Sequence, residues 1–97
     1  MRYGINLTMY KVPDNIQAIL RTLPNKPGCY LMKNSAGNII YVGKAINLRH
    51  RVRSYFQNIE NHHPRTKQLV QNIVDLDWIL VDSELEALIL EMNLIKK

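Results

Sequence analysis

Apolar residues recur at two different spacings along the chain, and the change of spacing marks the predicted elements. Intervals of three and four residues, typical of helices, occur in residues 15–22, 47–57, 65–74 and from 83 onward. Runs rich in aromatic and β-branched residues, typical of strands, occur at residues 28–33, 38–43 and 76–81. We therefore expect an α/β (α+β) domain in which helices flank a small, mainly antiparallel three-stranded sheet.

Polar residues at the predicted helix starts are of the kinds that cap helices. We expect Asp14 to cap the first helix and Asn47 the second. Ser83, followed three residues later by Glu86, forms a capping box for the last helix. The predicted buried face of that last helix consists of Leu85, Leu88, Ile89, Met92 and Ile95.

The first two strands flank a turn-forming segment, residues 34–37, and so predict a hairpin. If these four residues are the loop, Tyr30 lies directly opposite Tyr41. Because side chains alternate along a strand, each face of the hairpin then carries one set of residues. The predicted sets are Cys29, Leu31, Ile40 and Val42 on one face, and Tyr30, Met32, Ile39 and Tyr41 on the other.

Charge is distributed unevenly along the 97 residues, which carry 13 Lys and Arg against eight Asp and Glu, a net charge of +5. Residues 44–67 are strongly basic, whereas residues 75–91 contain acids and no base. A single cysteine excludes a disulfide framework, and there is no apolar run long enough to cross a membrane. We expect a cytoplasmic protein in which residues 1–22 form an arm and a short helix, followed by a functional domain at 23–97.

The residues best suited to chemistry follow the hairpin. Arg51 and Tyr55 are four apart, so they share one helix face and can approach Tyr30, Tyr41 and Lys44 at one end of the sheet. Cations bind phosphate, and we expect them to lower the pKa of a neighbouring phenol and make it a better proton acceptor. The alternative is that the tyrosines only pack and the arginines form a solvated helix face.

Two short motifs, Gly28-Cys29-Tyr30 and Tyr41-Val42-Gly43, lie at the predicted hairpin. Together they resemble the paired motif of the GIY-YIG nucleases, and the resemblance extends over residues 23–97. Its continuation is typical of the UvrC-type subgroup, the incision subunits of bacterial nucleotide excision repair. The residues that carry this closer resemblance are Lys44, Ala45, Leu48, Arg51, Val52, Arg53, Ser54, Tyr55 and Phe56, followed by residues 86–97.

The resemblance implies a role for each matched residue. Tyr30 and Tyr41 correspond to the motif tyrosines, Tyr55 to a third active-site aromatic, and Glu91 to a carboxylate that binds a single Mg²⁺ or Mn²⁺ ion. Glu91 also lies at the border of the predicted apolar helix face, where a carboxylate is costly unless it binds something. Either hairpin tyrosine can be the general base. The residues expected to contact DNA are Lys44, Arg49, Arg51, Arg53, Arg65 and Lys67, and of these Lys44 and Arg51 also belong to the catalytic set.

The implied function is a metal-dependent DNA endonuclease domain that makes the 3′ incision in nucleotide excision repair. Its implied partners are lesion-containing double-stranded DNA and, through regions of a longer protein, the helicase UvrB. We expect a monomeric domain that is a fragment of that protein and lacks a further Asn beyond Lys97.

A non-catalytic nucleic-acid-binding module is the alternative function. Glu91 distinguishes the two functions, because a protein that only binds phosphate has no use for this carboxylate. Three histidines and Cys29 fit no zinc-site spacing.

Overall fold

The structure is a computed structural model that describes residues 10–95, without the side chains of residues 84, 85 and 87. Its three strands are all antiparallel and lie in the order β2-β1-β3, so β1 is the central strand. The strands are β1 (Gly28–Lys33), β2 (Ile39–Ala45) and β3 (Asp75–Leu80). The helices are α1 (Asp14–Thr22), α2 (Leu48–Tyr55), the 3₁₀ helix η2 (Ile59–Asn61), α3 (Pro64–Asn72) and α4 (Glu84–Ile95). The predicted fold class is confirmed.

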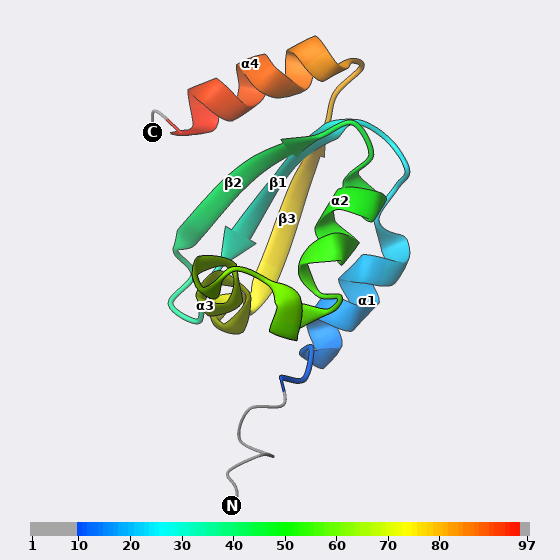
Figure 1. The fold of residues 1–97 in the computed structure, drawn as a ribbon. Helices are drawn as coiled ribbons and strands as arrows, with labels where there is room; N and C mark the ends of the chain where they lie inside the picture. Colours follow the sequence, from blue (N-terminus) through cyan, green and yellow to red (C-terminus); the bar gives the residue numbers. More distant parts are fainter. Residues whose placement is uncertain (1–9, 96–97) are drawn as a thin grey trace, which may run out of the picture.

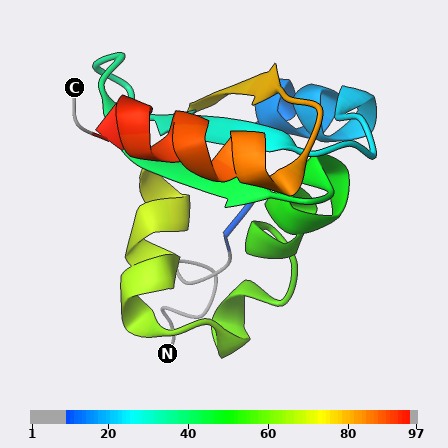
Figure 2. The same ribbon diagram turned by 90° about the horizontal axis from the view of Figure 1, so that it is seen from above.

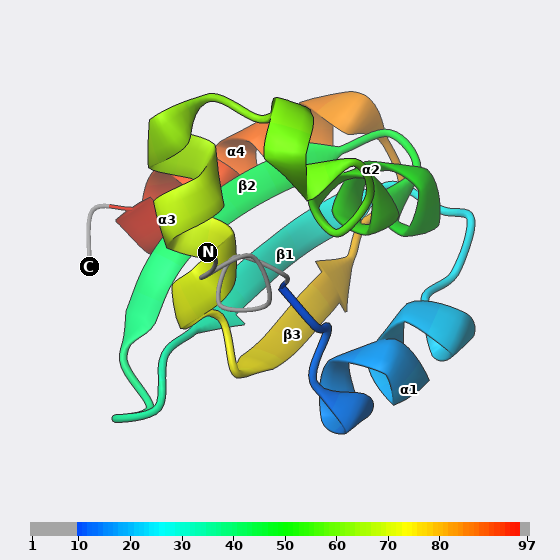
Figure 3. The ribbon, with the colours of Figure 1, turned by 60° about the horizontal axis from the view of Figure 1, so that its bottom comes forward.

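Helices cover both faces of the sheet. Figures 1 and 3 show α1, α2 and α3 on one face, and Figure 2 shows α4 alone on the other. The core lies under the three-helix face, and its fully or almost fully buried side chains are Ile16, Leu23, Tyr30, Met32, Leu48, Val52, Val70, Ile73 and Leu76. Leu48 and Val52 thus form the inward side of α2, and Val70 lies on that of α3.

Two of the three predicted helix caps form. The Asn47 side chain accepts a hydrogen bond from the backbone N–H of His50, and the Ser83 hydroxyl accepts one from the N–H of Glu86. The prediction for Asp14 is wrong, because Pro13 occupies the N-cap position without a side-chain hydrogen bond. Asp14 is instead the first helical residue, where its charge still suits the helix dipole.

The hairpin register differs from the prediction. Tyr30 pairs with Gly43, and Tyr41 pairs with Met32. The loop is one residue shorter than expected, because the Asn34 side chain accepts hydrogen bonds from the backbone N–H groups of Ala36 and Asn38. With Gly37 in the left-handed region at φ 83°, this is the three-residue loop followed by a bulge that hairpins often use.

The bulge adds one residue to β2 and changes which isoleucine faces the core. Ile40 packs against the buried cluster, whereas Ile39 is 52% exposed, so the faces predicted for this pair were reversed. Tyr41 is displaced by two positions relative to Tyr30, and a shift of two keeps a side chain on the same face. The tyrosines therefore still share a face.

The buried face predicted for α4 is wrong. Leu88, Ile89, Met92 and Ile95 are 38–63% exposed, while the half-buried positions include Glu91. Leu85, the fifth predicted residue, has no described side chain. Apolar residues lie almost all round this helix, so their spacing does not select a face. In the described part of the chain, no helix is long and apolar enough to cross a membrane.

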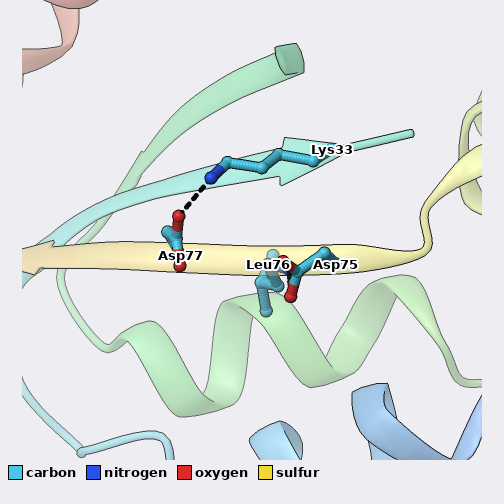
Figure 4. A network of polar contacts seen from close by, with 4 residues as sticks. All are labelled: Lys33, Asp75, Leu76 and Asp77. Carbon is cyan, nitrogen blue, oxygen red and sulfur yellow. Dashed lines mark hydrogen bonds and ion pairs between the residues drawn. The ribbon is translucent and has the colours of Figure 1, made fainter. Parts of the chain in front are cut away.

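An ion pair joins the central strand β1 to the edge strand β3. Lys33 Nζ on β1 lies 2.5 Å from Asp77 Oδ2 on β3 (Figure 4). Both side chains are accessible to solvent, so we expect this pair to add little to the stability of the fold.

Candidate active site

Three tyrosines from three different elements meet on the sheet face that α2 covers. Tyr30 comes from the central strand, Tyr41 from the edge strand, and Tyr55 from the last turn of α2. Their ring centroids are 6.2 Å apart for Tyr30 and Tyr41, 5.8 Å for Tyr30 and Tyr55, and 6.3 Å for Tyr41 and Tyr55. The hydroxyls of Tyr30 and Tyr55 are hydrogen-bonded at 2.8 Å. Residues 25 positions apart in the chain thus form one polar cluster.

The three rings differ in their access to solvent. Tyr30 is 1% exposed, whereas Tyr41 is 41% exposed on its edge strand. The Tyr30 ring lies across the backbone of its register partner Gly43, and a Cβ atom there would overlap the phenolic end of that ring. Glycine at this position therefore makes room for the buried tyrosine.

We expect Gly43→Ala to destabilise the domain by about 1–3 kcal/mol, because an overpacked Tyr30 ring must shift. Thermal unfolding measures the loss, and the ring signals of Tyr30 in NMR spectra measure the displacement. Gly37→Ala is the control, since a Cβ at that left-handed position meets no atom within 4 Å. That control should cost stability through backbone strain and leave the tyrosine signals unchanged. An unshifted Tyr30 in Gly43→Ala would contradict the packing argument.

Arg51 brings a positive charge to the tyrosine cluster. It precedes Tyr55 by one helical turn, and its exposed side chain lies close enough to Tyr30 and Tyr55 to interact with them electrostatically. The interaction with Tyr30, followed by that with Tyr55, raises the pKa of the guanidinium further. Arg51 is therefore a permanently charged group held beside the phenols.

The pKa values of all three phenols are raised, so the expected net lowering by neighbouring cations does not occur. Burial is the largest cause for each, and it raises the pKa of Tyr55 to about 12. Arg51 does lower the pKa of each phenol, but by less than burial raises it. The sequence shows the cation but not the desolvation. At neutral pH the cluster consists of neutral phenols that can donate and accept hydrogen bonds.

Glu91 approaches the cluster from the opposite face of the sheet. It lies half-buried on α4, and its charge raises the pKa of Tyr41 and also that of the buried thiol of Cys29. Among the described residues there is no group of three His, Cys, Asp or Glu side chains that could hold a metal ion. One hard carboxylate suits a single Mg²⁺ ion that keeps most of its ligands as water and substrate oxygens. The residues present therefore fit the implied metal.

Lys44, predicted to join the catalytic set, lies on the other face of the sheet. It pairs with Cys29, whereas the neighbouring pair of Tyr30 and Gly43 faces the core. Because successive side chains of a strand point to opposite faces, the side chain of Lys44 leaves β2 on the face that α4 covers. The structure thus brings together Tyr30, Tyr41, Tyr55 and Arg51, and it separates Lys44 from them by the sheet.

The other cations predicted to contact DNA surround three different grooves. Arg49 Nη2 donates a hydrogen bond to the carbonyl oxygen of Arg21 at 3.1 Å, and Arg53 lines a groove between α1 and α2. Arg65 lines a groove between α3 and the hairpin, whereas Lys67 lines one between α3 and the segment that follows α2. These cations are therefore divided among several grooves.

Two histidines have local roles that spacing alone did not reveal. His62 Nε2 lies 3.0 Å from the carbonyl oxygen of Tyr55 and so ties the following loop to the end of α2. His63 Nδ1 accepts a hydrogen bond from the backbone N–H of Arg65 and caps α3. A polar residue directly before Pro64 at a helix start was the available signal for the second role. Among the residues that the structure describes, neither histidine lies in a group of three potential metal ligands.

The fold and this tyrosine, arginine and glutamate site define an endonuclease domain of the GIY-YIG class. The model of the UvrC-like GIY-YIG domain family matches residues 26–97. UvrABC system protein C of Clostridium beijerinckii is 59% identical over 83 residues, which are 86% of this chain and 13% of that protein. The same protein of Alkaliphilus oremlandii is 60% identical over 78 residues, 80% of this chain and 13% of that protein. The chain belongs to the UvrC-like GIY-YIG family.

Solved structures agree with this assignment. The GIY-YIG N-terminal endonuclease domain of UvrC from Thermotoga maritima, bound to its catalytic magnesium ion, has a TM-score of 0.75 and 37% sequence identity. The match covers 86% of this chain and 89% of that domain. Three variants of the Thermotoga domain, each with one tyrosine replaced by phenylalanine, were also bound to the catalytic divalent cation. The predicted membership of the endonuclease family is confirmed, and the chain spans about an eighth of the length of its curated relatives.

Proposed function

We propose that this chain is a Mg²⁺- or Mn²⁺-dependent endonuclease domain that makes the 3′ incision in nucleotide excision repair. The observation that carries the proposal is the cluster of Tyr30, Tyr41, Tyr55 and Arg51, with the carboxylate of Glu91 close enough to influence Tyr41. Phenols and a guanidinium provide proton acceptors and a phosphate ligand. The carboxylate provides a site for a hard cation, which a module that only binds nucleic acid does not need.

The different burial of the two motif tyrosines assigns them different roles. The general base must contact the attacking water, and Tyr41, at 41% exposed, is open to solvent. Tyr30 is 1% exposed, and its hydroxyl is hydrogen-bonded to that of Tyr55 at 2.8 Å. We therefore assign the general base to Tyr41, and to Tyr30 the positioning of Tyr55 and Arg51.

Neutral phenols limit how the proton can move. Tyr41 accepts a proton from the attacking water on its phenolic oxygen while its own proton passes to bulk solvent. The water oxygen forms the new bond to phosphorus, the bond from phosphorus to the departing 3′ oxygen breaks, and that oxygen takes up a proton from solvent. The positive charge of Arg51 stabilises the negative charge that builds on the phosphate oxygens. Tyr55 holds Tyr30 through the hydrogen bond between their hydroxyls, and its ring lies 6.3 Å from that of Tyr41.

Glu91 is the residue that would hold the divalent cation. The three Tyr→Phe variants of the Thermotoga domain were bound to the cation, which supports a carboxylate rather than a phenol as the main protein ligand. When bound, the ion supplies positive charge that favours departure of the leaving oxygen. Glu91 is half-buried on α4, and the side chain of Lys44 leaves β2 on the same side of the sheet.

We expect Arg51→Ala to lower the rate of Mg²⁺-dependent nicking by on the order of a hundredfold or more, because charge stabilisation in the transition state is lost. Conversion of supercoiled plasmid to the nicked form, measured with saturating DNA, reports the rate. Arg65→Ala removes a charge on α3, and we expect it to keep that rate within a few-fold. Equal nicking by Arg51→Ala and the original chain would contradict the role of Arg51.

The context of the whole protein is also part of the proposal. Because the curated relatives are named UvrABC system protein C, we propose that the chain works in that repair system on double-stranded DNA that contains a lesion. We further propose contact with UvrB through other regions of a longer protein, a monomeric domain, and a cytoplasmic location. We propose residues 23–97 as the catalytic unit, with α1 packed onto its core through Ile16.

A further inference from the structure

Helix α2 carries positive charge on both of its flanks. Leu48 and Val52 are fully buried and define its inward side. At 3.6 residues per turn, Arg51 and Arg53 are separated by about 160° around the axis. Arg51 and Tyr55 therefore lie on the flank toward the tyrosine cluster, and Arg53 lies on the opposite flank, toward α1.

A groove of about 270 Å³ separates α2 from α1 on that second flank. Leu20 and Phe56 contribute apolar lining, and the exposed side chains of Arg21 and Arg53 contribute positive charge. Gln17 also lines the groove and adds an uncharged amide. The surface therefore combines two guanidinium groups with neutral hydrogen-bonding and apolar groups.

No acidic residue of these two helices neutralises the groove. Helix α2 contains no Asp or Glu, and the single acid of α1, Asp14, lies about 10 Å from Arg21 along the helix axis. In the part of the chain that the structure describes, neither Arg21 nor Arg53 forms an ion pair. The concentration of unpaired positive charge favours an anionic ligand.

Structural roles account for only part of this charge. Arg49 has one, since its Nη2 holds the Arg21 carbonyl at the end of α1. Arg49 and Arg53 are four residues apart on one face, an arrangement that costs stability because the like charges repel. Helix dipoles favour Arg21 and Arg53 in the last turns of their own helices, but they do not require the two side chains to share one groove.

The position of the groove fits the dimensions of a DNA duplex. A helix with its side chains is about 10–12 Å wide, so the groove and the tyrosine cluster lie about that far apart on either side of α2. The grooves of B-DNA are about 6 Å and 12 Å wide. A duplex that places one phosphate at Arg51 therefore brings the phosphates across a groove within reach of Arg53.

We propose that the groove between α1 and α2 is a second DNA-binding surface, on which Arg21 and Arg53 hold the phosphate backbone across a groove from the phosphate at Arg51. This inference rests on the proposed function, since it takes DNA as the substrate. Residues 14–22 of α1 precede the segment that the family model matches, whereas α2 lies within that segment, so the surface combines helices from both parts of the chain. Its role is to align the duplex rather than to take part in the chemistry.

Binding of a duplex of about two helical turns, measured by fluorescence anisotropy without metal over a range of salt concentrations, tests the proposal. For the double variant Arg21→Gln and Arg53→Gln we expect the slope of log affinity against log salt to fall by about 0.9 for each lost phosphate contact. At about 0.1 M salt, each lost contact should weaken binding by about eightfold. Nicking should show a raised KM and an unchanged kcat.

Two control variants complete the experiment. Arg21→Lys with Arg53→Lys keeps both charges and should keep the slope, whereas Lys33→Gln removes a charge far from the groove and should change neither slope nor affinity. An unchanged slope in the double Gln variant, or an equal loss in Lys33→Gln, would overturn the proposal. Failure of the proposed function is distinguishable, since it would appear as an absence of metal-dependent nicking in the original chain while the binding results stand.

Discussion

Glu91→Gln is expected to abolish Mg²⁺-dependent nicking, with a loss of at least about a thousandfold, because a neutral amide holds a divalent cation far less well than a carboxylate. The fold should survive, since Glu91 is half-buried on α4 and the substitution preserves its shape. Plasmid nicking measures the activity. Mn²⁺-induced broadening of the Tyr41 ring signals in NMR spectra measures metal binding separately from catalysis.

Glu86→Gln is the matched control, because it is the same substitution on the same helix. The Glu86 side chain accepts a hydrogen bond from the backbone N–H of Asp82, and an amide oxygen can replace that acceptor. Glu86→Gln should keep both Mn²⁺ broadening at Tyr41 and nicking. Persistent broadening in Glu91→Gln, or its loss in Glu86→Gln, would show that the metal binds elsewhere.

Tyr41→Phe is expected to lower the nicking rate by about a thousandfold, the size of effect that loss of a general base produces. Tyr30→Phe removes only a positioning hydroxyl, and we expect a loss of about tenfold together with lower stability. Burial raises the pKa of Tyr41, so the rate of the original chain should still be rising with pH above neutrality, where the small phenolate fraction grows. Tyr41→Phe should remove that rise, and Tyr30→Phe should keep it.

Measurement of nicking rates across pH with both single variants distinguishes the two roles. Circular dichroism of each variant provides the folding control, which matters most for the buried Tyr30. If both variants show the same pH profile and the same loss of rate, a unique tyrosine base is excluded. In that case the three phenols would act as one hydrogen-bonded unit.

Much of the fold could be predicted because the relevant forces are local. The Asn47 cap, the capping box of Ser83 and Glu86, and the inward face of α2 depend on residues within one helical turn of each other. The convergence of Arg51 and Tyr55 with the hairpin tyrosines followed from helical spacing and strand alternation. Resemblance to the nuclease family then supplied Glu91, which spacing alone would leave as a helix residue on an acidic segment.

Two features of the fold do not follow from the spacing of apolar residues. The hairpin register was set by the Asn34 side chain, a local contact that closes a shorter loop and places Gly43 under the Tyr30 ring. The buried side of α4 was selected by the sheet, because apolar residues surround that helix and no single face stands out. This second choice required α4 to meet strands that are far from it in the chain.

The electrostatics of the site depend partly on the sequence alone and partly on the tertiary structure. By itself, the sequence determined which helices and strands form, which residues are tyrosines and cations, and that Arg51 would lie near the phenols. Only the tertiary structure decided that burial outweighs Arg51 and raises the pKa of Tyr55 to about 12, and that Lys44 starts on the opposite face of the sheet. The physical reason is that desolvation depends on every atom packed around a group, whereas charge type is a property of the residue alone.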